Sequence, residues 1–101
     1  MPQSIRVAKA YDIPAGEGAT VYAGSIRIAV FNVDGVYHAI SDACIHAGAS
    51  LGEGRLEGEM VVCPLHGWRF NVKTGISDFD GGICLDRYDV RISGMDLYIS
   101  L

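Results

Sequence analysis

The sequence predicts an all-β domain built from small antiparallel sheets. Thirteen glycines are spread through the 101 residues, and no window longer than about ten residues holds apolar positions at helical spacing without a Gly or Pro. Alternation of apolar and polar positions recurs instead, together with two-residue turn signals. We expect one domain over residues 1–101, without internal repeats or linkers.

The expected strands follow one another along the chain. Short strands are plausible at residues 4–8 and 20–23. The apolar, β-branched segment 26–33, the turn signal Asp34-Gly35 and the segment 36–40 predict a hairpin. Further strands are expected at 60–62 and 68–71. Near the C-terminus, Tyr88, Val90 and Ile92 alternate with charged residues, and a turn at residues 93–94 leads to a last strand at 97–99.

Composition excludes several classes of function. Half of the residues are hydrophobic and 20% are charged, which is typical of a globular protein. The net charge of -4 disfavours binding to nucleic acid or to an anionic membrane surface. The N-terminal segment holds no apolar run long enough for a signal peptide or a membrane span. We therefore expect a cytoplasmic protein that binds no membrane.

Two short segments each combine a thiol with an imidazole. They are Cys44-Ile45-His46 and Cys63-Pro64-Leu65-His66, with sixteen residues between His46 and Cys63. Each segment follows an expected strand, and nearby Gly and Pro residues allow the chain to curl around a shared site. Three cysteines are an odd count, which metal ligation explains better than disulfides do.

These residues resemble the Rieske family, whose pattern is C-x-H followed further along the chain by C-x-x-H. The likeness extends over nearly the whole chain and includes residues 46–48, 51–54, 64–68 and 70–75. It implies a Rieske iron-sulfur fold with a cluster-binding subdomain of two loops. It also implies one [2Fe-2S] cluster, with Cys44 and Cys63 on the inner iron and His46 and His66 on the outer one. The alternative is a structural zinc site, which analysis of iron and acid-labile sulfide would distinguish.

Four positions indicate which kind of Rieske protein the chain resembles. Ala49 and Leu65 occupy positions where high-potential relatives carry a disulfide, and Trp68 and Phe70 stand where those relatives have Ser and Tyr. Without these hydroxyls, the charge of a reduced cluster is less compensated. The resemblance therefore implies a reduction potential near the low end of the Rieske range, about -150 mV.

The histidine count bears on activity. Ring-hydroxylating oxygenases add a mononuclear iron held by two His and a carboxylate, and His38 alone cannot supply two His once His46 and His66 bind the cluster. The chain therefore resembles the ferredoxin that carries single electrons from an NAD(P)H-dependent flavoprotein reductase to a terminal oxygenase of aromatic hydrocarbon catabolism. We expect an electron carrier rather than an enzyme, a monomer with transient partners. Two alternatives stay open: the small Rieske subunit of an assimilatory nitrite reductase, and an electron carrier for a different monooxygenase system.

Other conspicuous residues receive structural interpretations. His38 is expected to be a satisfied histidine of a strand, and Cys84 a small buried apolar residue. Trp68 fits the core and the rim of the site equally well. A solvated face accounts for five acidic residues better than steering of a basic partner does: Glu53, Glu57, Glu59, Asp78 and Asp80.

Overall fold

The computed structural model describes residues 4–43, 49–65, 67–78 and 82–101, in which two antiparallel sheets account for all the named strands. The larger sheet has the order β1-β9-β8-β4-β3-β2, and the smaller one the order β5-β6-β7. The bounds are β1 Ser4–Lys9, β2 Gly18–Ala23, β3 Ile26–Val33, β4 Val36–Ser41, β5 Arg55–Glu57, β6 Met60–Val62, β7 Arg69–Asn71, β8 Arg87–Ser93 and β9 Asp96–Ser100. Two short 3₁₀ turns, η1 Ala10–Asp12 and η2 Leu51–Glu53, complete these elements. The all-β prediction is confirmed.

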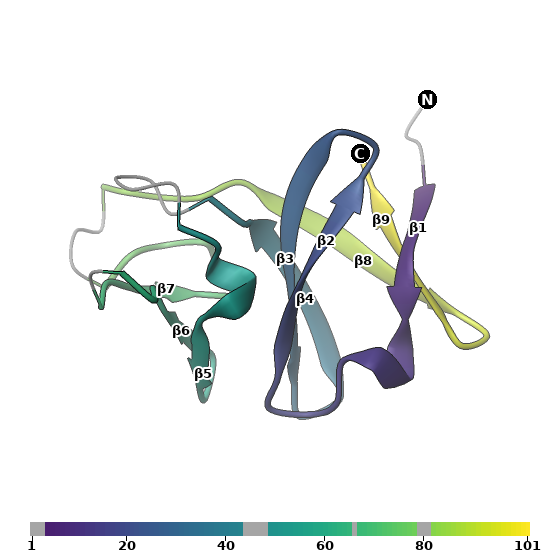
Figure 1. The fold of residues 1–101 in the computed structure, drawn as a ribbon, viewed down its shortest axis with the longest axis horizontal. Helices are drawn as coiled ribbons and strands as arrows, with labels where there is room; N and C mark the ends of the chain where they lie inside the picture. The colour runs from purple at the N-terminus through teal and green to yellow at the C-terminus, as the bar shows by residue number, and fades with distance from the viewer. Residues whose placement is uncertain (1–3, 44–48, 66, 79–81) are drawn as a thin grey trace.

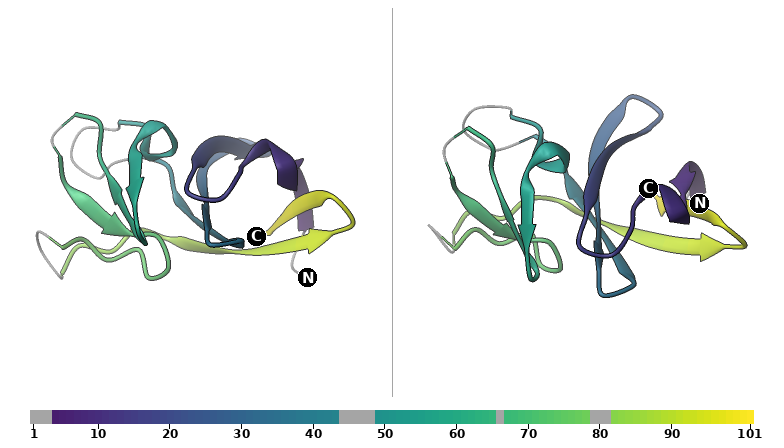
Figure 2. Two further views of the ribbon diagram at one scale, coloured as in Figure 1. Left: turned by 90° about the horizontal axis from the view of Figure 1, so that it is seen from below. Right: turned by 60° about the horizontal axis from the view of Figure 1, so that its bottom comes forward.

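The small sheet lies at one end of the molecule, and the β8–β9 hairpin reaches the other end (Figure 1). Both views in Figure 2 keep this separation. Strand β4 joins β8 through only two paired positions, Ala39 with Tyr88 and Ile40 with Arg87. The chain leaves β4 toward the small sheet just beyond this point.

The predicted hairpin forms between β3 and β4. Asp34 and Gly35 both adopt positive φ, 52° and 89°, between the paired residues Val33 and Val36. This is the backbone geometry that a two-residue hairpin turn requires, because its twist matches that of the strands. The Asp-Gly signal therefore identified the turn correctly.

Strand β3 is buried on both faces, which explains its nearly unbroken apolar sequence. Ala29 and Phe31 belong to one buried cluster, which we call the junction cluster, whereas Ile28 and Val30 belong to a second cluster inside the large sheet. Small-sheet residues, including Val61 and Phe70, also enter the junction cluster. The two sheets are thus joined by shared apolar burial, which is the main stabilising contribution in such contacts.

Candidate metal centre

Two loops begin at strand ends beside the small sheet, and backbone hydrogen bonds close the base of each. In the first, Ala43 forms an isolated β-bridge with Ser50, and the Leu51 N–H donates to the Asp42 carbonyl at 2.8 Å. In the second, the Cys63 N–H donates to the Trp68 carbonyl at 2.7 Å. Each loop therefore has fixed ends.

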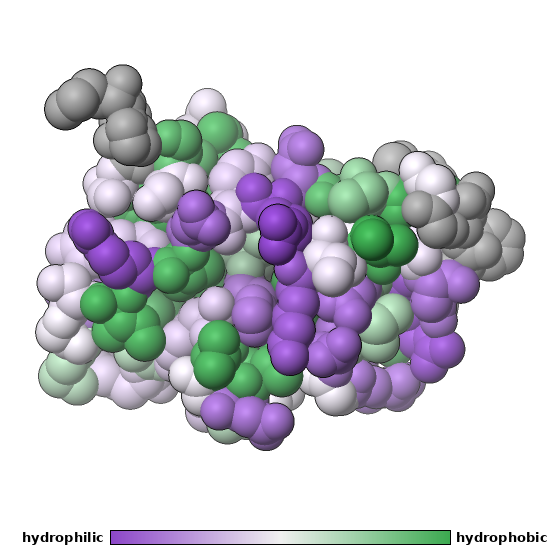
Figure 3. All heavy atoms as spheres, turned by 180° about the vertical axis from the view of Figure 1, so that it is seen from behind, coloured by the Kyte–Doolittle hydropathy of each residue, from purple (hydrophilic) through white to green (hydrophobic). Residues whose placement is uncertain are grey.

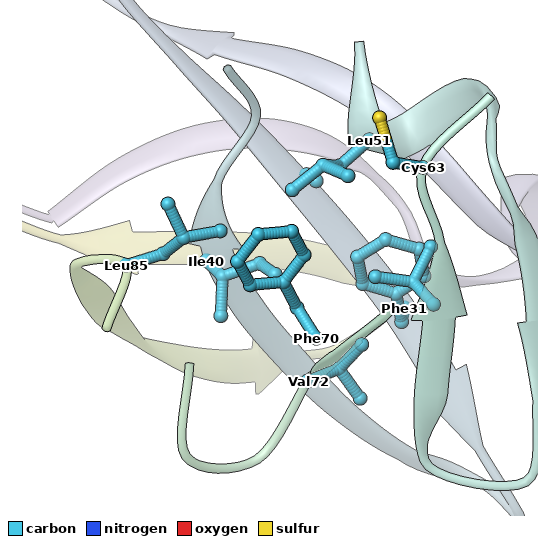
Figure 4. Close-up of a cluster of buried hydrophobic side chains, with 9 residues drawn as sticks. Phe31, Ile40, Leu51, Cys63, Phe70, Val72 and Leu85 are labelled. Carbon is cyan, nitrogen blue, oxygen red and sulfur yellow. The ribbon is translucent and has the colours of Figure 1, made fainter. Parts of the chain in front are cut away.

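Leu51 and Cys63 bring the two loop bases together. Both side chains belong to the junction cluster, at 0% and 1% exposure, and Leu51 directly follows the first loop. Figure 4 shows the Cys63 sulfur beside Leu51 and directed away from Phe70 and Val72. A thiol held in an apolar cluster, with its sulfur directed away from the aromatic core, has surroundings of the kind that tune a metal ligand.

Of the four predicted ligands, the structure describes Cys63. Cys44, His46 and His66 lie outside the described residues. Within the described ranges, no three His, Cys, Asp or Glu side chains are grouped as a metal site would require. A buried thiol at the base of one loop, next to the base of the other, fits a centre that takes thiolates and imidazoles from both loops.

Comparison with known proteins decides the family. The family model described as "Rieske [2Fe-2S] domain" matches residues 3–81. The chain belongs to the Rieske [2Fe-2S] domain family. It is 39% identical over 97 residues to the 3-phenylpropionate/cinnamic acid dioxygenase ferredoxin subunit of Escherichia coli K12, covering 89% of this chain and 86% of that relative.

Solved structures agree with this Rieske assignment. A complex of reduced oxygenase and oxidized ferredoxin in carbazole 1,9a-dioxygenase matches with a TM-score of 0.87 and 32% identity, covering 96% of this chain and 92% of the matched chain. A nitrite reductase small subunit from Mycobacterium tuberculosis, described as putative and NADH-dependent, matches with a TM-score of 0.90 and 19% identity, covering 100% and 96%. At that identity the second match shows the shared fold alone.

The structure places the Trp68 side chain against the core, which is one of the two locations that the sequence left open. Its side chain is partly buried and packs against the junction cluster. Its carbonyl closes the second loop of the Rieske domain by accepting from Cys63. Trp68 therefore supports the loop from the core side while keeping part of its surface exposed.

The interpretation of His38 as a satisfied histidine was wrong. Its Nε2 is buried and has no hydrogen-bond partner among the residues that the structure describes. Burial, the Lys73 ammonium and the Arg87 guanidinium lower the pKa of His38 below its ordinary value, against an opposing effect of Glu59. Strand β4 places His38 in the wall of a cavity of about 450 Å³ that Lys73 and Arg87 also line. Burial and the two cations therefore favour the neutral form of the imidazole.

The expectation for Cys84 was also wrong, because its side chain is exposed. Its sulfur lies 3.6 Å from the Thr74 carbonyl and 3.5 Å from the Leu85 carbonyl. The isolated bridge between Ile76 and Cys84 turns Leu85 inward instead, and Leu85 joins the junction cluster. Because neighbouring side chains of an extended segment point to opposite sides, a shift of one residue decides whether Cys84 or Leu85 faces the core.

Most of the acidic residues near the small sheet are exposed and paired. Arg55 contacts Glu57 at 2.7 Å, Arg69 contacts Asp78 at 2.7 Å, and Lys73 contacts Glu59 at 3.1 Å. Glu53 is exposed, and Asp80 lies outside the described residues. Paired surface charges create little net field, which agrees with a solvated face.

Among the residues that the structure describes, no helical segment has the length and apolar character needed to cross a membrane.

Sequence reasoning missed Asp42 at the first loop and gave Gly52 no role beyond its place in the family likeness. The Asp42 carboxylate is fully buried and accepts a 2.7 Å hydrogen bond from the Gly52 N–H. The available signal was an Asp directly after an apolar strand and two positions before a predicted ligand.

Proposed function

We propose that this chain is a ferredoxin that carries single electrons from an NAD(P)H-dependent flavoprotein reductase to a terminal oxygenase of aromatic catabolism. The observation that carries the proposal is the meeting of the two closed loop bases at Leu51 and Cys63. The proposal is supported by the similarity of this chain, over most of its length, to the ferredoxin subunit of a dioxygenase. The chain itself performs no substrate chemistry in this scheme.

Cys44 and Cys63 would hold one iron of a [2Fe-2S] cluster, and His46 and His66 the other. When bound, such a cluster supplies one-electron oxidation and reduction. Cys63 would supply its sulfur from a buried position, and the junction cluster below it would exclude water from that side. Apolar surroundings of this kind help to set a reduction potential.

Leu65 would form the contact with the partners. Its side chain is 63% exposed and lies three residues before Trp68, in the second loop. In Figure 3, hydrophilic side chains run down the middle of one face, with separate hydrophobic patches on either side. A small apolar contact at the loop suits the weak and rapidly released docking of electron-transfer proteins.

The nitrite reductase alternative rests on fold likeness alone. Reconstituted electron transfer to an aromatic-ring dioxygenase would support the present proposal. Isolation of the chain in a stable complex with a large sirohaem subunit would instead favour the alternative.

The first experiment is spectroscopic. The purified protein should contain two irons and two acid-labile sulfides per chain and give a Rieske EPR signal after reduction with dithionite. Cys63→Ser should abolish the signal, whereas the matched variant Cys84→Ser should retain it, because Cys84 is exposed elsewhere. Zinc without iron in the purified protein would refute the cluster.

A further inference from the structure

The base of the first loop is built around a fully buried carboxylate, Asp42. The backbone of Asp42 is hydrogen-bonded through both of its polar groups. Its N–H donates to the Arg27 carbonyl at 3.3 Å, and its carbonyl accepts from the Leu51 N–H. The side chain is therefore held on a fixed backbone between the large sheet and the loop.

Both carboxylate oxygens of Asp42 are occupied. Oδ1 accepts from the Thr20 hydroxyl at 2.9 Å and from the Gly52 N–H at 2.7 Å. Oδ2 accepts from the Ser50 hydroxyl at 2.8 Å and lies 2.8 Å from Nε of Arg27, with which it forms an ion pair.

These partners come from two different parts of the chain. Thr20 and Arg27 belong to β2 and β3 of the large sheet, whereas Ser50 and Gly52 follow the first loop. Asp42 itself precedes the loop. A single carboxylate thus ties the entry and the exit of the loop to each other and to the sheet.

Energetics argue for a role beyond stability. The Asp42 side chain is fully buried, whereas the Arg27 side chain is 37% exposed, so the desolvation cost falls mainly on the carboxylate. Attraction to a partner returns only part of such a cost, and an apolar residue of similar size often serves stability as well. A buried polar group can instead favour one arrangement of the surrounding chain over others, because each of its polar atoms must keep a hydrogen-bond partner.

Gly52 provides independent evidence for the same arrangement. A Cβ at this position would lie 2.6 Å from the backbone nitrogen of Thr20 and would also strike its hydroxyl. Only glycine lets the chain after the loop approach β2 closely enough for the Gly52 N–H to reach Asp42.

We infer that Asp42 is a positioning residue that fixes the geometry of the loop carrying Cys44 and His46. This inference rests on the proposed function, since it concerns the loop that would hold the cluster. Asp42 touches no ligand in the described contacts and acts through the loop ends.

The test compares Asp42→Asn with Asp96→Asn in the protein as isolated. Asp96 is a matched control because it also binds an arginine, Arg6, at 2.8 Å, but it lies on β9 in a half-exposed pair. Asn keeps the shape of Asp but places an N–H₂ group among donors, so the loop ends should loosen. We expect the Leu51 and Gly52 amides to exchange hydrogen about tenfold faster. The EPR lines should broaden, and iron should be lost several-fold faster to a chelator.

The control should change none of these three readouts. Unchanged amide exchange and an unchanged EPR line shape in Asp42→Asn would overturn the inference, even if the melting temperature fell. Should Asp42→Asn fail to fold, Ser50→Ala removes one loop contact and should give the same changes at smaller size, and their absence would equally overturn it. A wild-type protein without a Rieske signal would refute the proposed function instead, so the two failures are distinguishable.

Discussion

The Gly67 N–H donates to the Cys63 carbonyl at 3.1 Å, and Gly67 adopts a left-handed backbone, with φ of 72°. A Cβ there would meet open space, so the only penalty for another residue is conformational. Gly67→Ala should lower the free energy of unfolding by about 1–2 kcal/mol, whereas Gly67→Asn should cost less because Asn tolerates this region. Urea unfolding measures both values.

The control for Gly67 is Gly94, which has φ of 62° and equally open surroundings at the β8–β9 turn. Gly94→Ala should cost a similar free energy without changing the iron content, whereas Gly67→Ala should also reduce iron occupancy. Equal stabilities for the Ala and Asn variants of Gly67 would contradict the argument from backbone strain.

Leu65 should determine productive docking. Burial of a leucine side chain contributes about 1.5–3 kcal/mol, and a small contact recovers part of it. Leu65→Ala should therefore raise the ferredoxin concentration that half-saturates the oxygenase by roughly threefold to tenfold. Steady-state turnover with varied ferredoxin measures this concentration.

Met95 supplies the matched control for Leu65, because it is 59% exposed and lies in the β8–β9 turn at the other end of the molecule. Met95→Ala should leave turnover unchanged, and both variants should keep wild-type iron content and potential. An equal loss for both variants would mean that docking does not use the second loop.

His38 should make stability depend on pH. Because burial and the nearby cations lower the pKa of His38 in the folded protein, the unfolded chain binds its proton more readily. Stability is therefore full above the ordinary histidine pKa, about 6.5, and is lost as the pH falls from there toward the lowered folded pKa. Melting temperatures between pH 5 and 8 measure this slope.

His38→Leu should flatten the slope, since the buried Nε2 has no hydrogen-bond partner to lose within the described part of the chain. The comparison of wild type with variant removes contributions from all other titrating groups. A wild-type slope that persists unchanged in the variant would assign the pH dependence to other residues.

Local sequence patterns predicted the fold where one segment determines the structure. Asp34-Gly35 specifies its own turn, and the apolar sequence of β3 reflects burial on both faces. Strand β5 was missed because its three residues, with one apolar side chain, become a strand only by pairing with β6. Its formation depends on a partner rather than on its own pattern.

For the candidate site, too, local sequence patterns predicted some features, whereas contacts between distant residues could not be predicted. The spacing of the Cys and His residues predicted the two loops, and the structure describes Cys63 at the base of the second, where its N–H donates to the Trp68 carbonyl. The role of Asp42 could not be predicted, because Thr20, Arg27 and Ser50 lie 8 to 22 positions away along the chain. Cys84 was misassigned because the glycine-rich sequence before it does not determine which of two neighbouring side chains, Cys84 or Leu85, faces inward.

Phe70 and Trp68 should hold the reduction potential near the low end of the Rieske range, about -150 mV. Phe70 is fully buried in the junction cluster with Cys63, and Trp68 packs against that cluster, so neither side chain offers a hydroxyl there. Trp68→Ser combined with Phe70→Tyr should raise the potential, because hydrogen bonds from hydroxyls stabilise the added negative charge. Voltammetry measures the change. The control pair is Trp68→Ala with Phe70→Leu, which opens comparable space without adding a hydroxyl. An equal rise in the control would assign the effect to water access, and no rise in a folded Ser–Tyr variant would refute the hydroxyl argument.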